Sequence, residues 1–298
     1  MKETVGFIGL GSMGKRMAAN VLGKGFPLWV YDLRAEACND LGRQGAHVAE
    51  NLKDIVLNCN WIVLSLPDRP AVESVLFGEG GLESVLREGQ IIVDCGTTHP
   101  DFTRQAASTL AKRGVALLDA PVTGLESRAE AGSLTIMVGG DEGAFKQVLP
   151  LLETMGEIIV HMGSSGNGQL MKITNNVLYN ISVAAMAEML PLAVRLGLDP
   201  EKVRTVVGKG SGQSFGFDFF SELVLKRKFS TGFPMGIAFK DMAAVIEKAD
   251  EQKVPLPVAS AAMQTYKMAL AQGLGEESKG AMVKVWEKIM GVEVRSKP

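Results

Sequence analysis

Cysteine and histidine are both scarce in this chain, which has three of each among its 298 residues. Three cysteines, at Cys38, Cys59 and Cys95, do not build a disulfide framework, so a reducing compartment is favoured. The histidines are far apart, and no Cys-x-x-Cys spacing occurs. We therefore expect no metal site.

An excess of one charge is also missing, since 31 Lys and Arg residues stand against 33 Asp and Glu residues, for a formal net charge of −2. A broad surface for nucleic acid or for an anionic membrane needs an excess of Lys and Arg, so we expect neither partner. No signal-peptide pattern is visible, and the longest uncharged stretch, residues 173–187, is too rich in Asn, Ser and Thr for a membrane span. A cytoplasmic protein is expected.

Apolar material is abundant, because hydrophobic residues make up 46% of the chain and suffice for a packed core. In the first half of the chain, short β-rich runs alternate with helical patterns. The predicted strands are residues 4–8, 28–31, 61–66, 91–93, 116–118, 134–138 and 158–160. This alternation predicts an α/β domain over residues 1–162, with a parallel sheet covered by helices on both faces.

A glycine-rich break at residues 163–168 separates this half from a region without a convincing strand pattern. The predicted helices there are residues 168–196, 200–208, 222–226, 239–251, 257–272 and 278–290. Residues 163–298 are therefore predicted to form an all-helical domain.

A glycine-rich turn follows the first predicted strand and has the pattern Gly-x-Gly-x-x-Gly. Gly9 permits the tight turn, Gly11 lets a pyrophosphate approach the backbone, and Gly14 lets the next helix pack on the strand. The residues between the glycines are Leu10, Ser12 and Met13. Because the helix N-terminus supplies N–H groups and partial positive charge, the turn predicts a dinucleotide site.

The second predicted strand ends at Asp32, where a carboxylate accepts hydrogen bonds from ribose hydroxyls and repels a 2′-phosphate. Asp32 therefore favours NAD over NADP. Arg34 follows after Leu33 and weakens this inference, since an arginine there is able to pair with a phosphate.

Two further strand ends are candidates for the same crevice, because ligands of open α/β sheets bind beyond the carboxyl ends of the strands. Residues 65–68, which include Leu66 and Pro67, follow the third predicted strand, and residues 94–98, which include Thr97, follow the fourth. The alternative is that both are plain turns, since Pro, Asp, Gly and Thr are turn formers.

A polar stripe marks the first helix of the second half, with Lys172, Asn176 and Asn180 spaced at i, i+4 and i+8 on one face. The other sides of this helix are apolar, which is typical of a buried helix. Its polar residues then need partners or line a cavity. The alternative is that the stripe is a solvated face, and the pattern alone leaves both possibilities open.

Four motifs in this order resemble those of the β-hydroxyacid dehydrogenase family, the relatives of 3-hydroxyisobutyrate dehydrogenase. They are a cofactor turn at residues 6–14, a substrate segment at residues 119–124 that continues to Ala129, Gly132 and Leu134, a catalytic segment from Gly163 through Gly166, Gly168 and Lys172 to Asn176, and the late pair Lys240-Asp241. Residues 208–214 and 283–288 are similar to the 2-(hydroxymethyl)glutarate dehydrogenase branch.

The resemblance implies a Rossmann-type parallel sheet domain and an all-helical domain, joined by a long helix. It implies an oxidoreductase that interconverts a small β-hydroxy acid and its semialdehyde with NAD, or less favourably with NADP. A homodimer or homotetramer is expected, with the Met-rich helical half as interface; the alternative is that these methionines are core residues. Small carboxylate-bearing hydroxy acids or semialdehydes, of the 3-hydroxyisobutyrate, 2-(hydroxymethyl)glutarate or tartronate semialdehyde type, are the expected substrates.

The resemblance also assigns residues. Lys172 would be the acid/base, with Asn176 beside it. The cofactor would contact residues 9–14, Asp32, Leu33, Arg34, Leu66, Pro67, Thr97 and Lys240. The substrate would contact Thr123, Gly124, Leu125, Lys172, Asn176 and Asp241.

One departure concerns the substrate segment, where the family usually has Ser-Gly-Gly and this chain has Thr123-Gly124-Leu125. Threonine keeps the hydroxyl that holds a carboxylate, but leucine adds bulk and disfavours a positive φ. We therefore expect a substrate of different shape or a displaced one. Arg128 is a candidate to bind a second acidic group, although an ordinary surface arginine is the favoured interpretation.

Other functions stay open at this point. They are an NADP-dependent reductase of succinic semialdehyde or glyoxylate, a sulfolactaldehyde reductase, and a non-enzymatic NAD(P)-binding sensor module. The intact pair of Lys172 and Asn176 argues against the sensor. Lys172 also argues against an imine reductase, because those relatives usually lack the catalytic lysine.

Overall fold

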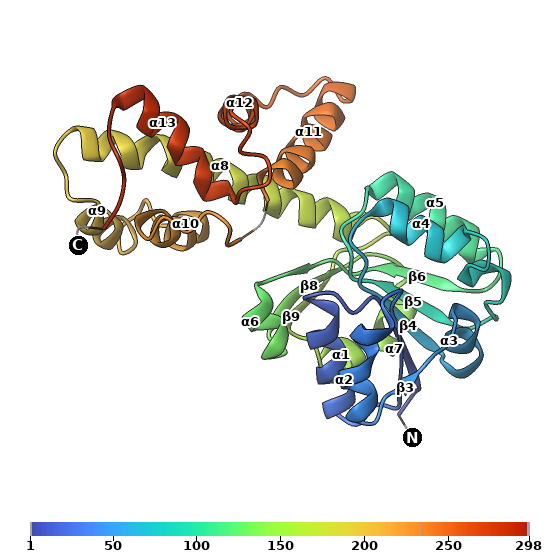
Figure 1. Cartoon of the computed structure of the whole chain (residues 1–298). Coiled ribbons are helices and arrows are strands. Elements are labelled where there is room, and N and C mark those ends of the chain that lie inside the picture. Colours follow the sequence, from blue (N-terminus) through green and yellow to red (C-terminus); the bar gives the residue numbers. More distant parts are fainter. Residues whose placement is uncertain (1, 233, 297–298) are drawn as a thin grey trace. The chain divides into compact units, whose positions relative to one another are not determined.

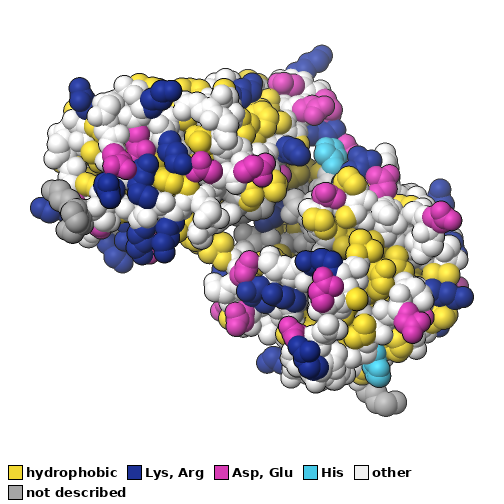
Figure 2. Space-filling view, in the orientation of Figure 1, with side chains coloured by type: hydrophobic (Ala, Val, Ile, Leu, Met, Phe, Trp, Pro, Cys, Tyr) yellow, Lys and Arg dark blue, Asp and Glu magenta, His cyan; other side chains and the backbone are white. Residues whose placement is uncertain are grey.

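The computed structural model describes residues 2–232 and 234–296, and the chain folds into two units. The first unit ends at Lys172 and the second begins at Ile173. Figure 1 labels most of the helices and strands of both units. Basic and acidic side chains are interspersed over the face shown in Figure 2, in keeping with the near-zero net charge.

A six-stranded parallel sheet forms the centre of the first unit, in the order β3-β2-β1-β4-β5-β6 (Figure 1). The strands are β1 (Val5–Ile8), β2 (Leu28–Tyr31), β3 (His47–Val48), β4 (Trp61–Leu64), β5 (Ile91–Asp94) and β6 (Ala116–Asp119). Every residue of β1 is buried, as expected for a central strand covered on both faces. Because the strand order reverses at β1, its carboxyl end lies at the switch point where such sheets bind ligands.

Helices cover both faces of this sheet, and each face has its own apolar core. One core joins the sheet to α1 (Gly14–Gly23), α2 (Ala35–Arg43) and α7 (Glu142–Leu152). The other joins it to α3 (Leu52–Asn58), α4 (Arg69–Phe77), the short 3-10 helix η1 (Leu82–Ser84) and α5 (Pro100–Ala111). The predicted parallel sheet with helices on both faces is thereby confirmed.

A separate three-stranded sheet completes the first unit, in the order β7-β8-β9. Its strands are β7 (Val122–Thr123), β8 (Leu134–Val138) and β9 (Gly156–His161), with α6 (Glu126–Glu130) between β7 and β8. The sequence pattern placed residues 134–138 and 158–160 in the parallel sheet, which is wrong. Strand β8 instead pairs parallel with β9 and antiparallel with β7, whose two residues are too few to show an alternating pattern.

Helix α8 (Asn167–Arg195) begins in the first unit and continues into the second, close to the predicted limits of 168–196. The second unit also contains α9 (Pro200–Val207), α10 (Phe215–Leu225), α11 (Met235–Glu251), α12 (Pro257–Ala271), the 3-10 helix η2 (Lys279–Met282) and α13 (Val283–Met290). Within its described residues it has no strand, as predicted. Helix α10 begins well before the expected residue 222, because the side chain of Ser214 caps it by accepting from the N–H of Phe217.

Among the described residues, α8 alone has the length and hydropathy that a membrane-spanning helix needs. A core helix passes the same test, and α8 contributes Val183, Ala184, Ala187 and Leu190 to the core of the second unit. These residues pack against Phe220 of α10, Met242 of α11 and Tyr266 of α12, all of which are buried. These buried residues account for part of the apolar character of α8, whereas Leu178 and Met189 on the same helix are exposed.

Candidate active site

The glycine-rich turn connects β1 to α1 and has no room for side chains at two of its glycines. Gly9 has a φ of +93°, and a Cβ there would lie 2.4 Å from the carbonyl oxygen of Ser65. A Cβ on Gly14 would lie 2.1 Å from the carbonyl oxygen of Gly9. Around Gly11, by contrast, no protein atom lies within 4 Å of a Cβ position, so the backbone is open to a ligand. This cradle fits the pyrophosphate of a dinucleotide.

Asp32 is bonded to the same turn. Its Oδ2 accepts from the N–H of Leu10 at 2.7 Å, and its Oδ1 accepts from the N–H and Nε of Arg34 at 2.9 and 3.1 Å. Burial alone would raise the pKa of Asp32, but these hydrogen bonds hold it below its usual value. Arg34, which was expected to be able to pair with a 2′-phosphate, thus forms an ion pair with the Asp32 carboxylate. Leu33, between them in sequence, is 92% exposed.

The turns after β4 and β5 lie against the glycine turn, as expected for neighbouring carboxyl ends of parallel strands. The Leu66 side chain lies 3.0 Å from the position that a Cβ on Gly9 would take. The Leu66 carbonyl oxygen lies 3.1 Å from the position that a Cβ on Gly96 would take. Pro67 and Thr97 are exposed at these turns. The alternative of plain turns holds for Asp68, which caps α4 by accepting from the N–H of Ala71.

Two buried carboxyl groups lie at the ends of β5 and β6, where Asp94 and Asp119 are neighbours in the strand register. Burial raises the pKa of Asp94 to about 7; the N–H of Gly96 lowers it and the nearby Asp119 raises it. Burial also raises the pKa of Asp119, against hydrogen bonds from the N–H groups of Gly166 and Gln169 at 2.8 and 3.0 Å. Asp119 thereby caps the start of α8.

Lys172 points to the predicted substrate segment of the first unit. Its Nζ donates to the carbonyl oxygen of Val122 at 2.8 Å, and Thr123 is the next residue of β7. The ammonium is partly buried, so its charge is less screened than on an open surface. The structure thus brings the predicted acid/base residue to the predicted substrate segment.

The expected strain at Leu125 is absent. The positive φ of the segment, +139°, belongs to Gly124, whereas Leu125 has a φ of −86° that any residue adopts. The strain argument was therefore wrong, although the Leu125 side chain is 39% exposed and keeps its bulk beside Thr123. Arg128 is exposed, and its guanidinium lies 3.8 Å from the carboxylate of Glu157.

In the second unit, α8 and α11 are tied by polar side chains. Asn176 Nδ2 donates to Asp241 Oδ2 at 2.9 Å. Lys240, which directly precedes Asp241 on α11, is exposed. Asn180 is only 1% exposed and accepts from Lys279 Nζ at 2.8 Å. The alternative of a solvated stripe is therefore wrong at Asn180, whose side chain is bonded inside the unit.

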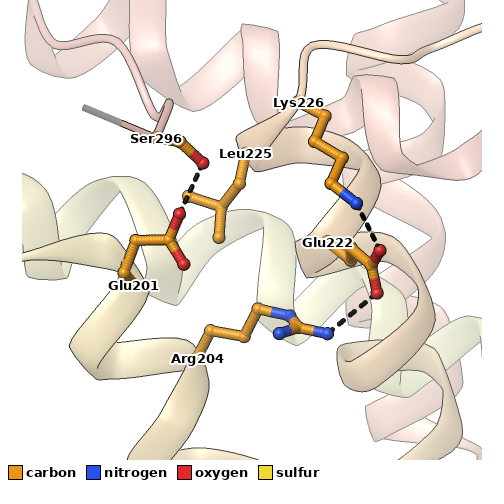
Figure 3. A pocket seen from close by; sticks show the side chains of 6 residues that line it. All are labelled: Glu201, Arg204, Glu222, Leu225, Lys226 and Ser296. Carbon is orange, nitrogen blue, oxygen red and sulfur yellow. Dashed lines mark hydrogen bonds and ion pairs between the residues drawn. The ribbon is translucent and has the colours of Figure 1, made fainter. Parts of the chain in front are cut away.

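A separate pocket of the second unit, about 160 Å³ in volume, does not contain these residues (Figure 3). Its charged side chains pair with one another, since Lys226 Nζ and Arg204 contact Glu222 at 2.6 and 3.0 Å. It is lined by Glu201, Arg204, Glu222, Leu225, Lys226 and Ser296. Within the described ranges, no group of three or more His, Cys, Asp or Glu is placed to hold a metal ion.

Two family sequence models match most of the chain. One, described as the NAD binding domain of 6-phosphogluconate dehydrogenase, matches residues 4–163. The other, described as NAD-binding of NADP-dependent 3-hydroxyisobutyrate dehydrogenase, matches residues 166–286. The chain belongs to the β-hydroxyacid dehydrogenase family. It is an NAD(P)-dependent oxidoreductase of the hydroxyacid dehydrogenase class.

Individual relatives match over nearly the whole chain. The 2-(hydroxymethyl)glutarate dehydrogenase of Eubacterium barkeri is 39% identical over 291 residues, which cover 97% of each chain. The NAD-dependent L-serine dehydrogenase of Pseudomonas aeruginosa is 33% identical and covers 98% of this chain and 100% of its own. The crystal structure of a 3-hydroxyisobutyrate dehydrogenase from Salmonella typhimurium has a TM-score of 0.87 at 29% identity, covering 95% of this chain and 100% of that one.

In this β-hydroxyacid dehydrogenase, two buried polar residues were missed by sequence reasoning, one at the start of α8 and one that bonds to Asn180 further along it. Gln169 is fully buried and Lys279 is 2% exposed, yet neither was singled out. An amide or an ammonium has no distinctive pattern on a helix, because its partner is chosen by packing between distant segments. The available signal for Gln169 was its place in the first turn of a buried helix, directly after the glycine break.

Proposed function

We propose that this dehydrogenase interconverts a small β-hydroxy acid and its semialdehyde with NAD, using Lys172 as the acid/base. The observation that carries the proposal is the hydrogen bond from Lys172 Nζ to the carbonyl oxygen of Val122, which brings the ammonium next to Thr123. A hydroxy acid has two groups to recognise, a carboxylate and a reacting hydroxyl. Thr123 supplies a hydroxyl for the carboxylate, and Lys172 supplies an ammonium for the reacting hydroxyl.

The chemistry follows from charge and position. A bound nicotinamide accepts the hydride in oxidation and supplies it in reduction. Lys172 Nζ stabilises the negative charge that develops on the substrate oxygen, donating a proton in reduction and accepting one in oxidation. The Thr123 hydroxyl and the Gly124 N–H hold the carboxylate, which orients the reacting carbon. Asn176, one turn further along α8, holds the substrate hydroxyl or orients the lysine.

The substrate class is supported by the names of the relatives. Hydroxyisobutyrate, 2-(hydroxymethyl)glutarate and serine all carry a hydroxymethyl group on the carbon that bears the carboxylate.

We also propose that the protein is cytoplasmic. Its three cysteines support this proposal, because all are buried as free thiols.

A panel of substrates tests the function. Purified protein is assayed for NADH formation with 3-hydroxyisobutyrate, 2-(hydroxymethyl)glutarate and serine, and for NADH consumption with the matching aldehydes. We expect at least one pair to react in both directions. Tight NADH binding without turnover of any compound would instead support the sensor module.

We expect NAD(H) to be preferred over NADP(H), because the ionised Asp32 carboxylate repels a 2′-phosphate and holds Arg34 in an ion pair. The measurement is kcat/KM with each cofactor on the same substrate. Asp32→Asn removes the repulsion and frees Arg34, so the difference in kcat/KM between NAD(H) and NADP(H) should become smaller. Equal or better use of NADP by the wild type would show that Arg34 controls the choice.

We propose that the protein is at least a dimer in solution. Met235, Met242 and Met282 do not support this, because all three are fully buried in their own unit, whereas Met268 is exposed. Support comes from large apolar side chains that stay exposed in that unit, namely Leu178, Met189, Leu196, Val206 and Phe215.

Sedimentation at assay concentration checks this oligomer. A species of twice the 31.8 kDa chain mass, or larger, is expected. Phe215→Glu should weaken it, because a charge would be buried in an apolar contact. A single species at the chain mass would refute the proposal.

A further inference from the structure

Gln169 joins the start of α8 to the turn after β5. Its side chain is completely buried, and both polar atoms of the amide are used. Oε1 accepts from the N–H of Thr98 at 3.0 Å, and Nε2 donates to the carbonyl oxygen of Gly96 at 2.9 Å. The amide therefore bonds to the backbone of residues 96–98 as a neighbouring strand would, with one donor and one acceptor.

Thr97 lies between these two bonds. It is exposed, whereas Gly96 and Thr98 on either side are buried, so the amide holds the backbone while the Thr97 side chain faces outward. Methionine in place of Gln169 would keep the length and lose both bonds. Glutamate would keep an acceptor and lose the donor to Gly96.

The backbone of Gln169 is anchored to a third segment. Its N–H donates to Asp119 Oδ2 at the end of β6, and the N–H of Gly166 donates to Asp119 Oδ1. From Asp119 the chain runs directly to β7, where Val122 accepts from Lys172. One buried residue thus links the turn after β5, the substrate segment and the helix that carries Lys172.

The start of α8 has no room to move. A Cβ on Gly168 would lie 2.4 Å from the carbonyl oxygen of Met137 and 2.7 Å from that of Asp119, so helix and strands already touch through backbone atoms. If the hydrogen bonds of the Gln169 side-chain amide are lost, we therefore expect the helix to keep its position and the turn at residues 96–98 to shift.

We propose that Gln169 is a positioning residue for the reaction, holding the turn at residues 96–98 and the Lys172 ammonium in a fixed mutual position. The inference rests on the proposed function, in which Thr97 contacts the cofactor and Lys172 handles the proton. A shift of that turn changes the distance between the bound cofactor and the substrate held at Lys172. Chemistry is then slowed more than substrate binding.

The chain contains a matched control in Gln90. This glutamine is 2% exposed, accepts from the N–H of Arg87 at 2.7 Å, and donates to the carbonyl oxygens of Val56 and Cys59 at 2.8 and 2.7 Å. It precedes β5, whereas residues 96–98 follow β5. Gln90 therefore performs the same backbone bridging at the opposite end of the same strand.

The test compares Gln169→Met with Gln90→Met. Both variants leave buried backbone groups without their bonds, so both should lower Tm by a few degrees. Gln169→Met alone should lower kcat, by about tenfold or more, with KM for the hydroxy acid within about threefold of wild type because Thr123 and Gly124 are untouched. NADH fluorescence should show weaker binding, and amide hydrogen exchange of residues 94–104 should accelerate, in Gln169→Met only.

The outcomes separate this inference from the proposed function. An equal loss of kcat in both variants would reduce Gln169 to a structural role and overturn the inference. If the wild type turns over no hydroxy acid, the proposed function fails, and unchanged NADH affinity and exchange in Gln169→Met would then overturn the positioning role as well. Gln169→Glu, which keeps the side-chain length and one oxygen, replaces Gln169→Met if that variant does not fold.

Discussion

Replacing Lys172 with Ala should lower kcat by about a hundredfold or more, the range expected when a general acid/base is lost. The ammonium is the charged group that the structure brings to Val122 and Thr123, and water would have to replace it in the proton transfer. The NADH dissociation constant should change little, because the glycine turn and Asp32 are untouched. Steady-state kinetics and NADH fluorescence measure the two effects separately.

The pH dependence gives a second measure of Lys172. The rate of hydroxy acid oxidation should rise with pH as one group loses its proton, and this limb should vanish in Lys172→Ala. Lys172→Arg should not restore activity, since a guanidinium does not release a proton near neutral pH.

Lys146→Met is the matched control, because Lys146 is an exposed lysine of the same unit that pairs with Glu142 on α7. It should keep wild-type kcat. If Lys172→Ala keeps near wild-type kcat on the best substrate, the assignment is wrong, and Lys240→Met becomes the variant to measure next.

Gly9→Ala should damage both folding and cofactor binding. At a φ of +93° an alanine is strained, and its Cβ would lie 2.4 Å from the Ser65 carbonyl oxygen. Strain of this kind costs about 1–3 kcal/mol, and the contact with backbone adds to it. We expect a clear fall in Tm and NADH binding too weak to measure by fluorescence.

Gly11→Ala separates the two effects, because its Cβ would meet no protein atom within 4 Å. The Tm should stay within about one degree of wild type, as for surface substitutions generally. The NADH dissociation constant should rise about tenfold or more, equivalent to at least about 1.4 kcal/mol. Unchanged NADH affinity in Gly11→Ala would show that the pyrophosphate does not approach the turn.

Local patterns in the sequence account for much of the fold. The run from Val5 to Ile8 is apolar at every position and is followed by glycines at fixed spacing, so both the central strand and the tight turn are encoded within a few residues. Asp32 was placed in the same way, since it directly follows an apolar strand. Helices α9, α11 and α12 began or ended near the predicted residues, because Pro200 and Pro257 occupy first-turn positions that mark a helix start.

Short or unpatterned elements escaped this reasoning. Strands β3 and β7 have two residues each, which is a single strand period and too short to show an alternating pattern. Without β7, the antiparallel pairing of β8 was invisible, and residues 134–138 were assigned to the parallel sheet. The early start of α10 depended on a serine cap, which is common in loops as well.

The sequence by itself determined the order of the longer strands and helices, the dinucleotide turn, Asp32, and the spacing of Lys172 and Asn176 on one helix, because each depends on residues close together in the chain. Only the tertiary structure decided which partners the polar groups take. Lys172 bonds to Val122 at a separation of 50 residues, Gln169 to Gly96 at 73, and Lys279 to Asn180 at 99. Such pairs follow from how buried segments pack, since a buried polar group must find a partner wherever the fold provides one.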